Sequence, residues 1–268
     1  MQDGETDKKA APRRDARGRP IFFTRFDTDA AFGIADFSKR LDGVQNEVRL
    51  VHYYDGEEGR ERPDAALLLR NLAERHEFIR LELLDIREKD AREGETREQA
   101  AREQAGQGEA AGPEVARPEV APCTVFQNAE GAPLLRFYGG FAESERQSLL
   151  GILALLGGDA SFMPPAPRAL ESELRELEKA APELRIKIFV TARCAQCPPA
   201  VITVASLALR FPFLSLEVYD AGEFRDSAEK YRVIAIPRIV INEETSFVGD
   251  QGPTGLTRKI LEAAIRRP

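Results

Sequence analysis

The chain has 268 residues, which is enough for one large domain or two small ones. Hydrophobic residues make up 43% of the chain and charged residues 31%, so a substantial core can form. The formal net charge of −7 argues against nucleic acid as a main partner. Three cysteines are too few for a disulfide scaffold.

The N-terminal residues 1–20 are polar and rich in lysine and arginine. We predict a disordered tail there and no secretory signal, because the segment lacks an apolar stretch. The longest apolar run, residues 149–156, contains Gly151 and is too short to cross a bilayer. The sequence therefore predicts a cytoplasmic protein with no membrane partner.

The first half of the chain alternates between helical and strand patterns. In chain order, the periodicity predicts a helix at 28–41, a strand at 47–54, a helix at 64–76 and a strand at 78–84. Residues 87–120 consist mostly of Ala, Glu, Arg, Gln and Gly. We predict a flexible insertion there, because too little apolar surface is available to offset its ordering entropy. A hairpin of strands at 122–126 and 134–138 and a helix at 143–156 follow.

The second half repeats this order after a proline-rich joint at 161–167. Its predicted elements are a helix at 168–180, a strand at 184–190, a helix after the cysteines, a strand at 213–219, a helix at 223–231, strands at 237–241 and 246–248, and a helix at 254–265. Pro122 and Asn128 bracket a strand in the first half as Pro237 and Asn242 do in the second. We therefore predict two copies of one α/β unit, at 21–165 and 166–268.

Cys194 and Cys197 lie in a short turn between the strand at 184–190 and the helix that follows it. Cysteines at this spacing can close a disulfide across one turn. The junction places the first sulfur at a helix N-terminus, where free N–H groups and the macrodipole favour the thiolate that attacks disulfides. Arg193 would also favour a thiolate, although a solvated loop arginine explains it nearly as well.

These residues resemble the thioredoxin and glutaredoxin family, with Cys194-Ala-Gln-Cys197 after a strand and Ile236-Pro237 opening a later one. The tandem arrangement resembles the glutaredoxin-like protein disulfide oxidoreductase of thermophiles and the N-terminal domain of the alkyl hydroperoxide reductase flavoprotein. The resemblance implies an α/β fold of two tandem thioredoxin-like units, each a central mixed sheet flanked by helices. It also implies that Pro237 is cis and packs beside the cysteine pair.

The activity implied by the resemblance is thiol–disulfide exchange. Cys194 would be the exposed nucleophile, Cys197 the more buried resolving thiol, and Pro237 would leave the nearby backbone open for a substrate strand. The cysteine pair would be the redox group, with no bound cofactor. Electrons would come from a thioredoxin-reductase-like flavoprotein and pass to protein disulfides or to a peroxiredoxin.

Two features depart from the family pattern. The first half has no cysteine pair, and the loop after its first strand, at 55–60, contains no thiol. That half is therefore predicted to be a degenerate copy that stabilises the active half. The strand before Cys194 also lacks the buried aspartate of thioredoxin, and Glu82 or Asp85 from the first half are candidates to replace it.

Other functions are compatible with the same residues. The fold could serve as a binding scaffold with structural cysteines, or as a glutathione-dependent glutaredoxin. A metal site would need further ligands beside Cys194 and Cys197, for which Cys123, His52 and His76 are the candidates. Cys123 is more typical of a core position, although a redox role is open to it.

Overall fold

A computed structural model of the protein describes residues 13–14, 20–21, 40–55, 64–87, 117–128, 131–164, 168–179 and 183–265. The predicted helix at 28–41 falls almost wholly outside these residues, as does most of the predicted insertion at 87–120. In the segment predicted to be disordered, β1 (Arg13–Arg14) pairs with β2 (Pro20–Ile21), so the prediction does not hold at these positions.

The described elements of the first half are β3 (Val48–Tyr54), α2 (Asp64–Arg75), β4 (Ile79–Asp85), β5 (Cys123–Gln127), β6 (Pro133–Tyr138) and α4 (Glu145–Leu156). The short helix η2 (Ala160–Phe162) follows α4. The second half contains α5 (Arg168–Glu178), β7 (Leu184–Val190), α6 (Cys197–Ala208), β8 (Leu214–Asp220), α7 (Arg225–Lys230), β9 (Arg238–Ile241), β10 (Thr245–Val248) and α8 (Gly252–Ile265). These boundaries lie close to the predicted ones.

Eight strands form one sheet in the order β10-β9-β7-β8-β6-β5-β3-β4. In the second half β7 is parallel to β8 and antiparallel to β9, which pairs antiparallel with β10. In the first half β3 is parallel to β4 and antiparallel to β5, which pairs antiparallel with β6. The two halves therefore have the same strand order and the same strand directions, as the predicted duplication requires.

The two units join through β6 and β8, which run parallel with Tyr138 opposite Tyr219. The carboxyl ends of β3, β6, β8 and β7 consequently lie at the same edge of the sheet. The loops that leave these ends carry the cysteine pair in the second unit and the start of α4 in the first. This edge is where side chains from the two units meet.

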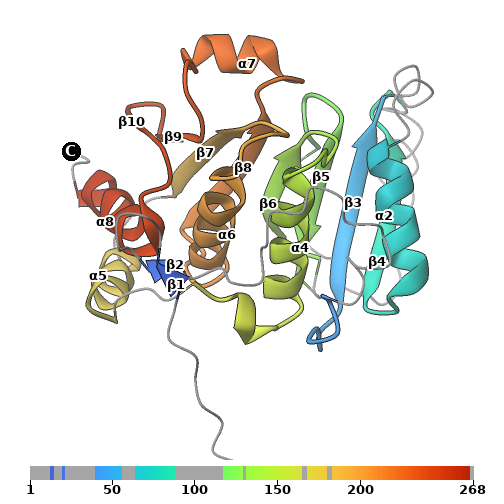
Figure 1. Ribbon diagram of the computed structural model, residues 1–268, viewed down its shortest axis with the longest axis horizontal. Coiled ribbons are helices and arrows are strands. Elements are labelled where there is room, and N and C mark those ends of the chain that lie inside the picture. Colours follow the sequence, from blue (N-terminus) through green and yellow to red (C-terminus); the bar gives the residue numbers. More distant parts are fainter. Residues whose placement is uncertain are drawn as a thin grey trace, which may run out of the picture.

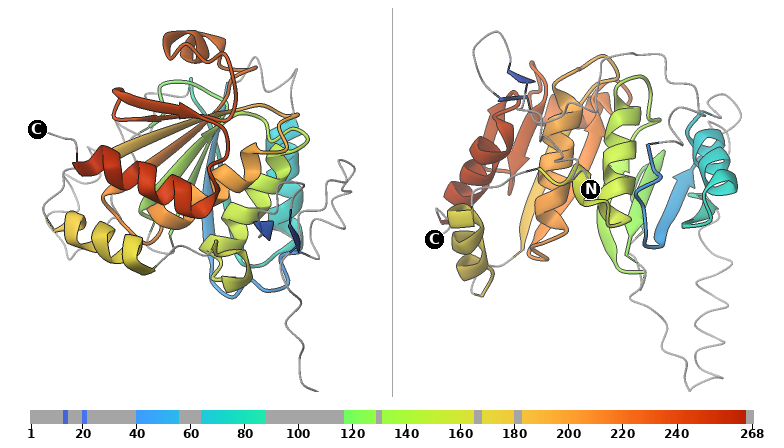
Figure 2. Two further views of the ribbon diagram at one scale, coloured as in Figure 1. Left: turned by 60° about the vertical axis from the view of Figure 1, so that its left-hand side comes forward. Right: turned by 60° about the horizontal axis from the view of Figure 1, so that its bottom comes forward.

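Helices α2, α4, α6 and α8 stand in a row across one face of the sheet, and α5 packs beside α8 (Figure 1). Figure 2 shows this row from two further directions and shows α7 apart from it. One continuous core fills the space between the row and the sheet, with Leu69 and Leu153 from the first unit and Val204 and Ile260 from the second. The apolar faces of the helices thus bury both units into a single body.

The other face of the sheet carries a smaller aromatic cluster across the junction of the units. The rings of Tyr138 and Tyr219 are stacked at 4.4 Å, and Phe224 approaches both edge-on. Such ring pairs stabilise a junction beyond the apolar area that they bury. Within the described part of the chain, no helix is long and apolar enough to cross a membrane.

Candidate functional site

Cys194 and Cys197 form a disulfide bond, with their Cα atoms 5.4 Å apart. The backbone reaches this geometry through two successive turns, in which Cys194 N–H donates to the Thr191 carbonyl and Cys197 N–H to the Cys194 carbonyl, each at 3.1 Å. Cys194 is partly exposed, whereas only 1% of Cys197 is exposed. An external disulfide can therefore reach the first sulfur but not the second.

Helix α6 begins at Cys197, and Pro198 occupies its first turn, where the missing N–H costs nothing. Pro199 also lacks an N–H, and the Cys197 N–H is bonded to the Cys194 carbonyl, so the expected free N–H groups are not available in this turn. The helix dipole still adds partial positive charge beside the cysteine pair, which favours a thiolate over a thiol. The predicted placement of the pair at a strand-to-helix junction is confirmed.

Both predicted strand-initial prolines follow cis peptide bonds, Ile236–Pro237 and Ala121–Pro122. Pro237 immediately precedes β9, whose neighbour β7 leads into the cysteine turn, with Arg238 opposite Phe189. The Pro237 carbonyl accepts a hydrogen bond from Gly249 N–H at 2.8 Å. On the loop just before Pro237, the side chain of Ile234 is 92% exposed, which the sequence pattern alone did not reveal.

The start of α4, from the first unit, supports the cysteine turn of the second. Ser144 Oγ donates to the carbonyl oxygen of Ala192 at 2.6 Å and lies 3.3 Å from that of Cys194. Its backbone N–H also donates to Ala192 O at 2.9 Å. Arg193, 87% of whose side chain is exposed, forms an ion pair with Glu143 at 3.3 Å. The first unit therefore holds the redox loop directly.

A buried carboxyl group follows immediately in the chain. Glu145 is 1% exposed, and one of its oxygens accepts a hydrogen bond from Ala142 N–H at 3.0 Å while the other has no partner. Burial raises the pKa of Glu145 to about 9, and the neighbouring carboxylates of Asp220 and Glu223 contribute to this rise. The carboxyl group is consequently protonated at neutral pH.

Glu145 lies at the same end of the molecule as the cysteines. Helices α4 and α6 pack side by side, and their first residues are Glu145 and Cys197. Asp220, which raises the pKa of Glu145, stands opposite Val190 at the end of β7. The acid of the first unit and the buried cysteine of the second thus begin two helices that pack against each other.

The sequence-based candidates for this acid were wrong. Glu82 and Asp85 lie on β4 at the far edge of the sheet, and four strands separate β4 from β7. Glu145 was missed because an acid in the first turn of a helix is usually a solvated residue that favours the helix dipole. Only the parallel pairing of β6 with β8 places α4 beside α6 and so buries this side chain.

The candidates for a metal site do not gather around the cysteines. Cys123 is fully buried on β5, and burial raises the pKa of its thiol, as expected of a core cysteine. His52 on β3 contacts Thr124 Oγ1 through Nδ1 at 2.9 Å, and burial lowers its pKa to about 4. His76 lies against the Phe78 ring. Among the described residues, no three His, Cys, Asp or Glu side chains are arranged to hold a metal ion.

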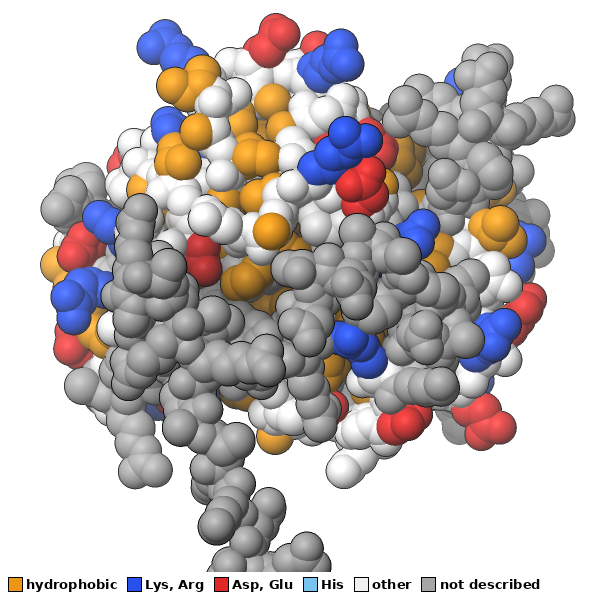
Figure 3. Space-filling view, in the orientation of Figure 1, with side chains coloured by type: hydrophobic (Ala, Val, Ile, Leu, Met, Phe, Trp, Pro, Cys, Tyr) orange, Lys and Arg blue, Asp and Glu red, His pale blue; other side chains and the backbone are white. Residues whose placement is uncertain are grey.

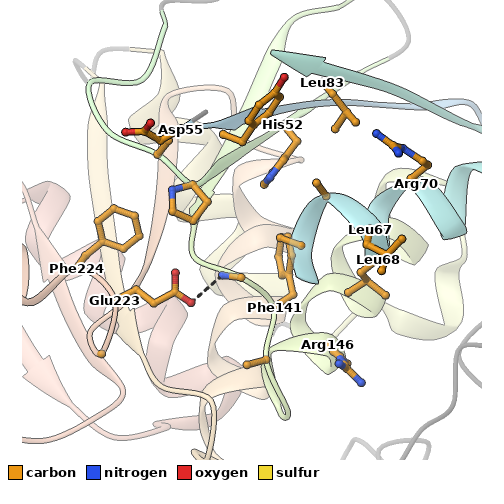
Figure 4. A pocket seen from close by; sticks show the side chains of 18 of the residues that line it. His52, Asp55, Leu67, Leu68, Arg70, Leu83, Phe141, Arg146, Glu223 and Phe224 are labelled. Atoms are coloured by element: carbon orange, nitrogen blue, oxygen red, sulfur yellow. Dashed lines mark hydrogen bonds between the residues drawn. The ribbon is translucent and has the colours of Figure 1, made fainter. Parts of the chain in front are cut away.

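A cavity of about 1120 Å³ opens in the first unit. Its walls come from the end of β3, the start of α2, the loop at Ala121 and Pro122, and residues 222–225 of the second unit. Figure 4 shows His52, Leu68 and Phe141 around it, with Glu223 accepting a hydrogen bond from Gly140 N–H. In Figure 3, hydrophobic side chains gather on the upper part of the molecule, at the end from which α7 projects.

The part of the chain that contains the cysteine pair matches a known domain family. The thioredoxin domain family matches residues 184–262. The thioredoxin of Methanocaldococcus jannaschii is 29% identical over 86 residues, which are 32% of this chain and 95% of that protein. An alkyl hydroperoxide reductase of Pseudomonas putida is 26% identical over 134 residues, half of this chain but only 25% of that protein.

Two solved structures share the whole arrangement. The N-terminal domain of alkylhydroperoxide reductase from Enterococcus faecalis superposes with a TM-score of 0.65 and 20% identity, covering 87% of this chain and 100% of that one. A protein disulfide oxidoreductase from Aeropyrum pernix gives a TM-score of 0.62 and 21% identity, covering 87% and 93%. At these identities the likeness concerns the fold, and it extends over both units.

Proposed function

We propose that this chain, a thioredoxin-like disulfide oxidoreductase with a Cys-x-x-Cys pair, reduces disulfides in other proteins through Cys194 and Cys197. The observation that carries this proposal is the unequal exposure of the two sulfurs beside a protonated, buried carboxyl group. An accessible first cysteine and a sheltered second one suit a two-step exchange, in which the attacking and the resolving thiol have different tasks.

The reaction begins from the dithiol. The Cys194 thiolate attacks one sulfur of the substrate disulfide, forms a mixed disulfide and releases the first substrate thiolate. The Cys197 thiolate then attacks the Cys194 sulfur, which restores the Cys194–Cys197 disulfide and releases the second substrate thiolate. Two electrons have then passed from the protein to the substrate. The substrate strand lies beside Pro237, and the pair itself serves as the redox group without a bound cofactor.

Glu145 supplies the proton transfer that this sequence needs. Cys197 is buried, and burial disfavours its thiolate, so a base must take its proton before it can attack. The pKa of Glu145 is about 9, so its protonated form predominates at neutral pH, and the carboxylate fraction that can take the Cys197 proton is small and grows as the pH rises. When the disulfide is reduced again, the protonated carboxyl returns the proton to Cys197.

The electron donor that we propose is a flavoprotein disulfide reductase of the thioredoxin-reductase type, and the acceptors are disulfide-bearing proteins or a peroxiredoxin. The supporting observation is the likeness to a quarter of the length of an alkyl hydroperoxide reductase. We place the activity in the cytoplasm, because a cysteine-poor chain with one reactive pair suits a reducing compartment.

The test is reduction of insulin by the protein in the presence of dithiothreitol, followed by turbidity. We expect catalysis by the wild type and, with Cys197→Ser, accumulation of a mixed disulfide visible by mass spectrometry. The rival function is a binding scaffold with structural cysteines. An alkylation titration of the reduced protein separates the two, because the scaffold has two inert thiols, whereas the enzyme has one thiol with a pKa well below ~8.5.

A further inference from the structure

The cavity in the first unit stands where the second unit carries its disulfide. We propose that this cavity binds an extended, acidic and apolar segment of the polypeptide substrate, while the disulfide of that substrate lies over Cys194. The inference rests on the proposed oxidoreductase function and identifies the kind of substrate that the site accepts. It also assigns the first unit a task in substrate binding besides supporting the redox loop.

The walls of the cavity are the counterparts of the elements around the disulfide. Tyr54 ends β3 and Asp55 follows it, as Val190 ends β7, and the first turn of α2 lies where α6 begins in the other unit. The Ala121–Pro122 loop corresponds to the Ile236–Pro237 loop. The first unit has thus kept the substrate-facing architecture of a redox unit although its loop at 55–60 contains no thiol.

The backbone at this place is open to an additional strand. Within the described residues, Ala121 forms no backbone hydrogen bond, and the same holds for its counterpart Ile236. Both residues are partly exposed and lie just before a paired strand. An extended peptide can therefore pair its own N–H and C=O groups with those of Ala121, which is how a strand adds to an open edge.

The side chains around the cavity favour apolar and acidic residues. Leu67 is 52% exposed at the wall, and Leu83 lines the cavity from β4, so an apolar side chain would find an anchor there. Arg70 and Arg146 also line the cavity, are exposed, and pair with no acid of the described residues. Two free guanidinium groups attract carboxylates, which they can hold in bidentate pairs.

The acids at the same cavity are already engaged and do not oppose such a segment. Asp55 forms an ion pair with Arg87 at 2.6 Å, and Glu143 pairs with Arg193. Glu223 accepts the Gly140 N–H at 3.2 Å. Arg70 and Arg146, together with Arg225 from the second unit, therefore provide the charge that is left to meet a ligand within the described walls.

An ion pair links the wall of the cavity to the redox loop. Glu143 lines the cavity and holds Arg193, the residue next to Cys194, while residues 222–225 close the cavity from the second unit. A volume of about 1120 Å³ exceeds the roughly 300–1,000 Å³ typical of small-molecule pockets. A polypeptide segment that runs from the cavity to the sulfurs fits this shape better than a compact thiol such as glutathione.

The experiment uses two synthetic disulfides with the same reactive cysteine. One is the dimer of N-acetylcysteine amide, and the other carries in addition an arm of about eight residues containing Leu, Asp and Glu. Single-turnover rates are measured with the pre-reduced, full-length protein. We expect the arm to raise the rate constant per mole of disulfide by about tenfold at low substrate concentration, which corresponds to one buried leucine or one good ion pair.

Variants of the cavity test the location. Leu67→Lys and Arg70→Glu should each lower the ratio of the two rates towards one. The matched controls are Ile265→Lys, an exposed apolar residue at the end of α8, and Arg258→Glu, an exposed arginine on the same helix, and both should keep the wild-type ratio. A ratio near one in the wild type, or an equal loss in the controls, would overturn the inference.

Failure of the proposed function gives a different result in the rate assay, because the wild type would then leave the short disulfide intact as well.

A binding assay tests the cavity without any disulfide exchange. The arm peptide with serine in place of cysteine is labelled and titrated with Cys194→Ser protein by fluorescence anisotropy. We expect saturable binding that Leu67→Lys weakens and that basic peptides of equal length do not compete for. Competition by glutathione at comparable concentration would overturn the proposed polypeptide ligand.

Discussion

The two units of this protein share one arrangement of strands and helices and differ in their functional side chains. Each contains four strands in the same order and direction, and each has a cis proline before its third strand. In each, the carbonyl of this proline accepts a hydrogen bond from a glycine after the fourth strand, Gly139 in the first unit and Gly249 in the second. The duplication is therefore visible in individual hydrogen bonds as well as in topology.

The chemistry is divided between the units. The second unit has the cysteine pair but no acid on β7, whereas the first unit has no pair but supplies Glu145 and Ser144. A loop with thiols is thus not sufficient by itself, because one of its supports, and the acid that we propose as its proton acceptor, come from the neighbouring copy. The comparison teaches that loss of the thiols from one copy leaves its helix, its cavity and its carboxyl group available for other tasks.

The sharpest test of this division exchanges a cysteine in each unit. Cys194→Ser should reduce insulin reduction to the uncatalysed rate, because no other described thiol is both accessible and near the resolving thiol. Cys123→Ser should leave the rate within about twofold, since Cys123 is fully buried on β5 and its raised pKa keeps it a thiol. Turnover with the same insulin preparation measures both, and activity retained in Cys194→Ser would contradict the assignment.

A large effect is also expected when the first unit loses its acid. Glu145→Gln should slow the resolving step by about 10²-fold, the lower end of what a positioned acid or base contributes. The readout is the lifetime of the mixed disulfide and its pH profile, whose upper limb should shift when the group with a pKa of about 9 is removed. Glu82→Gln on β4 is the matched control. An equally slow resolving step in that variant would contradict the assignment of Glu145 as the acid.

The contrast between Glu82 and Glu145 shows which features of the site local sequence patterns can predict and which they cannot. Helix and strand periods located the strands of the large sheet and the α-helices beside them, because each buries one apolar face. The cysteine turn and Pro237 followed from local motifs. Glu145 depends instead on which strand of one unit pairs with which strand of the other, a long-range choice that no local pattern in a single sequence expresses. The cavity at Ala121 escaped prediction for the same reason.

The contact between units should also respond to a substitution at Gly151. A Cβ atom at this position on α4 would overlap the side chain of Ile202 on α6, which is fully buried and cannot move aside. Gly151→Val should lower the free energy of unfolding by about 2–3 kcal/mol, as overpacking of a close contact does. Urea unfolding should still show one transition, because sheet and core run through both units. Two separate transitions would show that the units fold independently.

The buried carboxyl group should make stability depend on pH. Its folded-state pKa, about 9, lies above the unfolded value of 4.5, so the folded protein keeps a proton that the unfolded chain releases. Stability is therefore fully present below pH 4.5 and declines as pH rises towards 9. Glu145→Gln removes this decline and should raise stability at pH 8 by about 1 kcal/mol or more. Urea midpoints at about pH 5 and pH 8 measure it, and a larger gain at the lower pH would contradict the assignment.

The smallest effect is expected from changes to the segment between β4 and β5, which is predicted to be flexible. In the second unit, α7 lies between the corresponding strands. Replacing residues 88–116 by a Gly/Ser linker should change the free energy of unfolding by less than about 1 kcal/mol, because loop length enters only logarithmically. Arg117 and Pro118 should be kept. The Arg117 guanidinium donates to the Asp85 carbonyl at 2.6 Å and lies 5.9 Å from the Tyr53 ring centroid, and Pro118 is buried.

A deletion that extends through residue 118 should therefore cost a further 1–2 kcal/mol or so, the worth of a charged hydrogen bond with a partly buried ring contact. Urea unfolding of the two deletion variants gives this difference directly, and the insulin assay should show the same turnover for both, because β4 lies at the far edge of the sheet from β7. Equal stability of the two variants would mean that the contacts of Arg117 and Pro118 contribute nothing. A loss of cooperative unfolding in the shorter deletion would instead mean that the segment predicted to be flexible belongs to the core of the first unit.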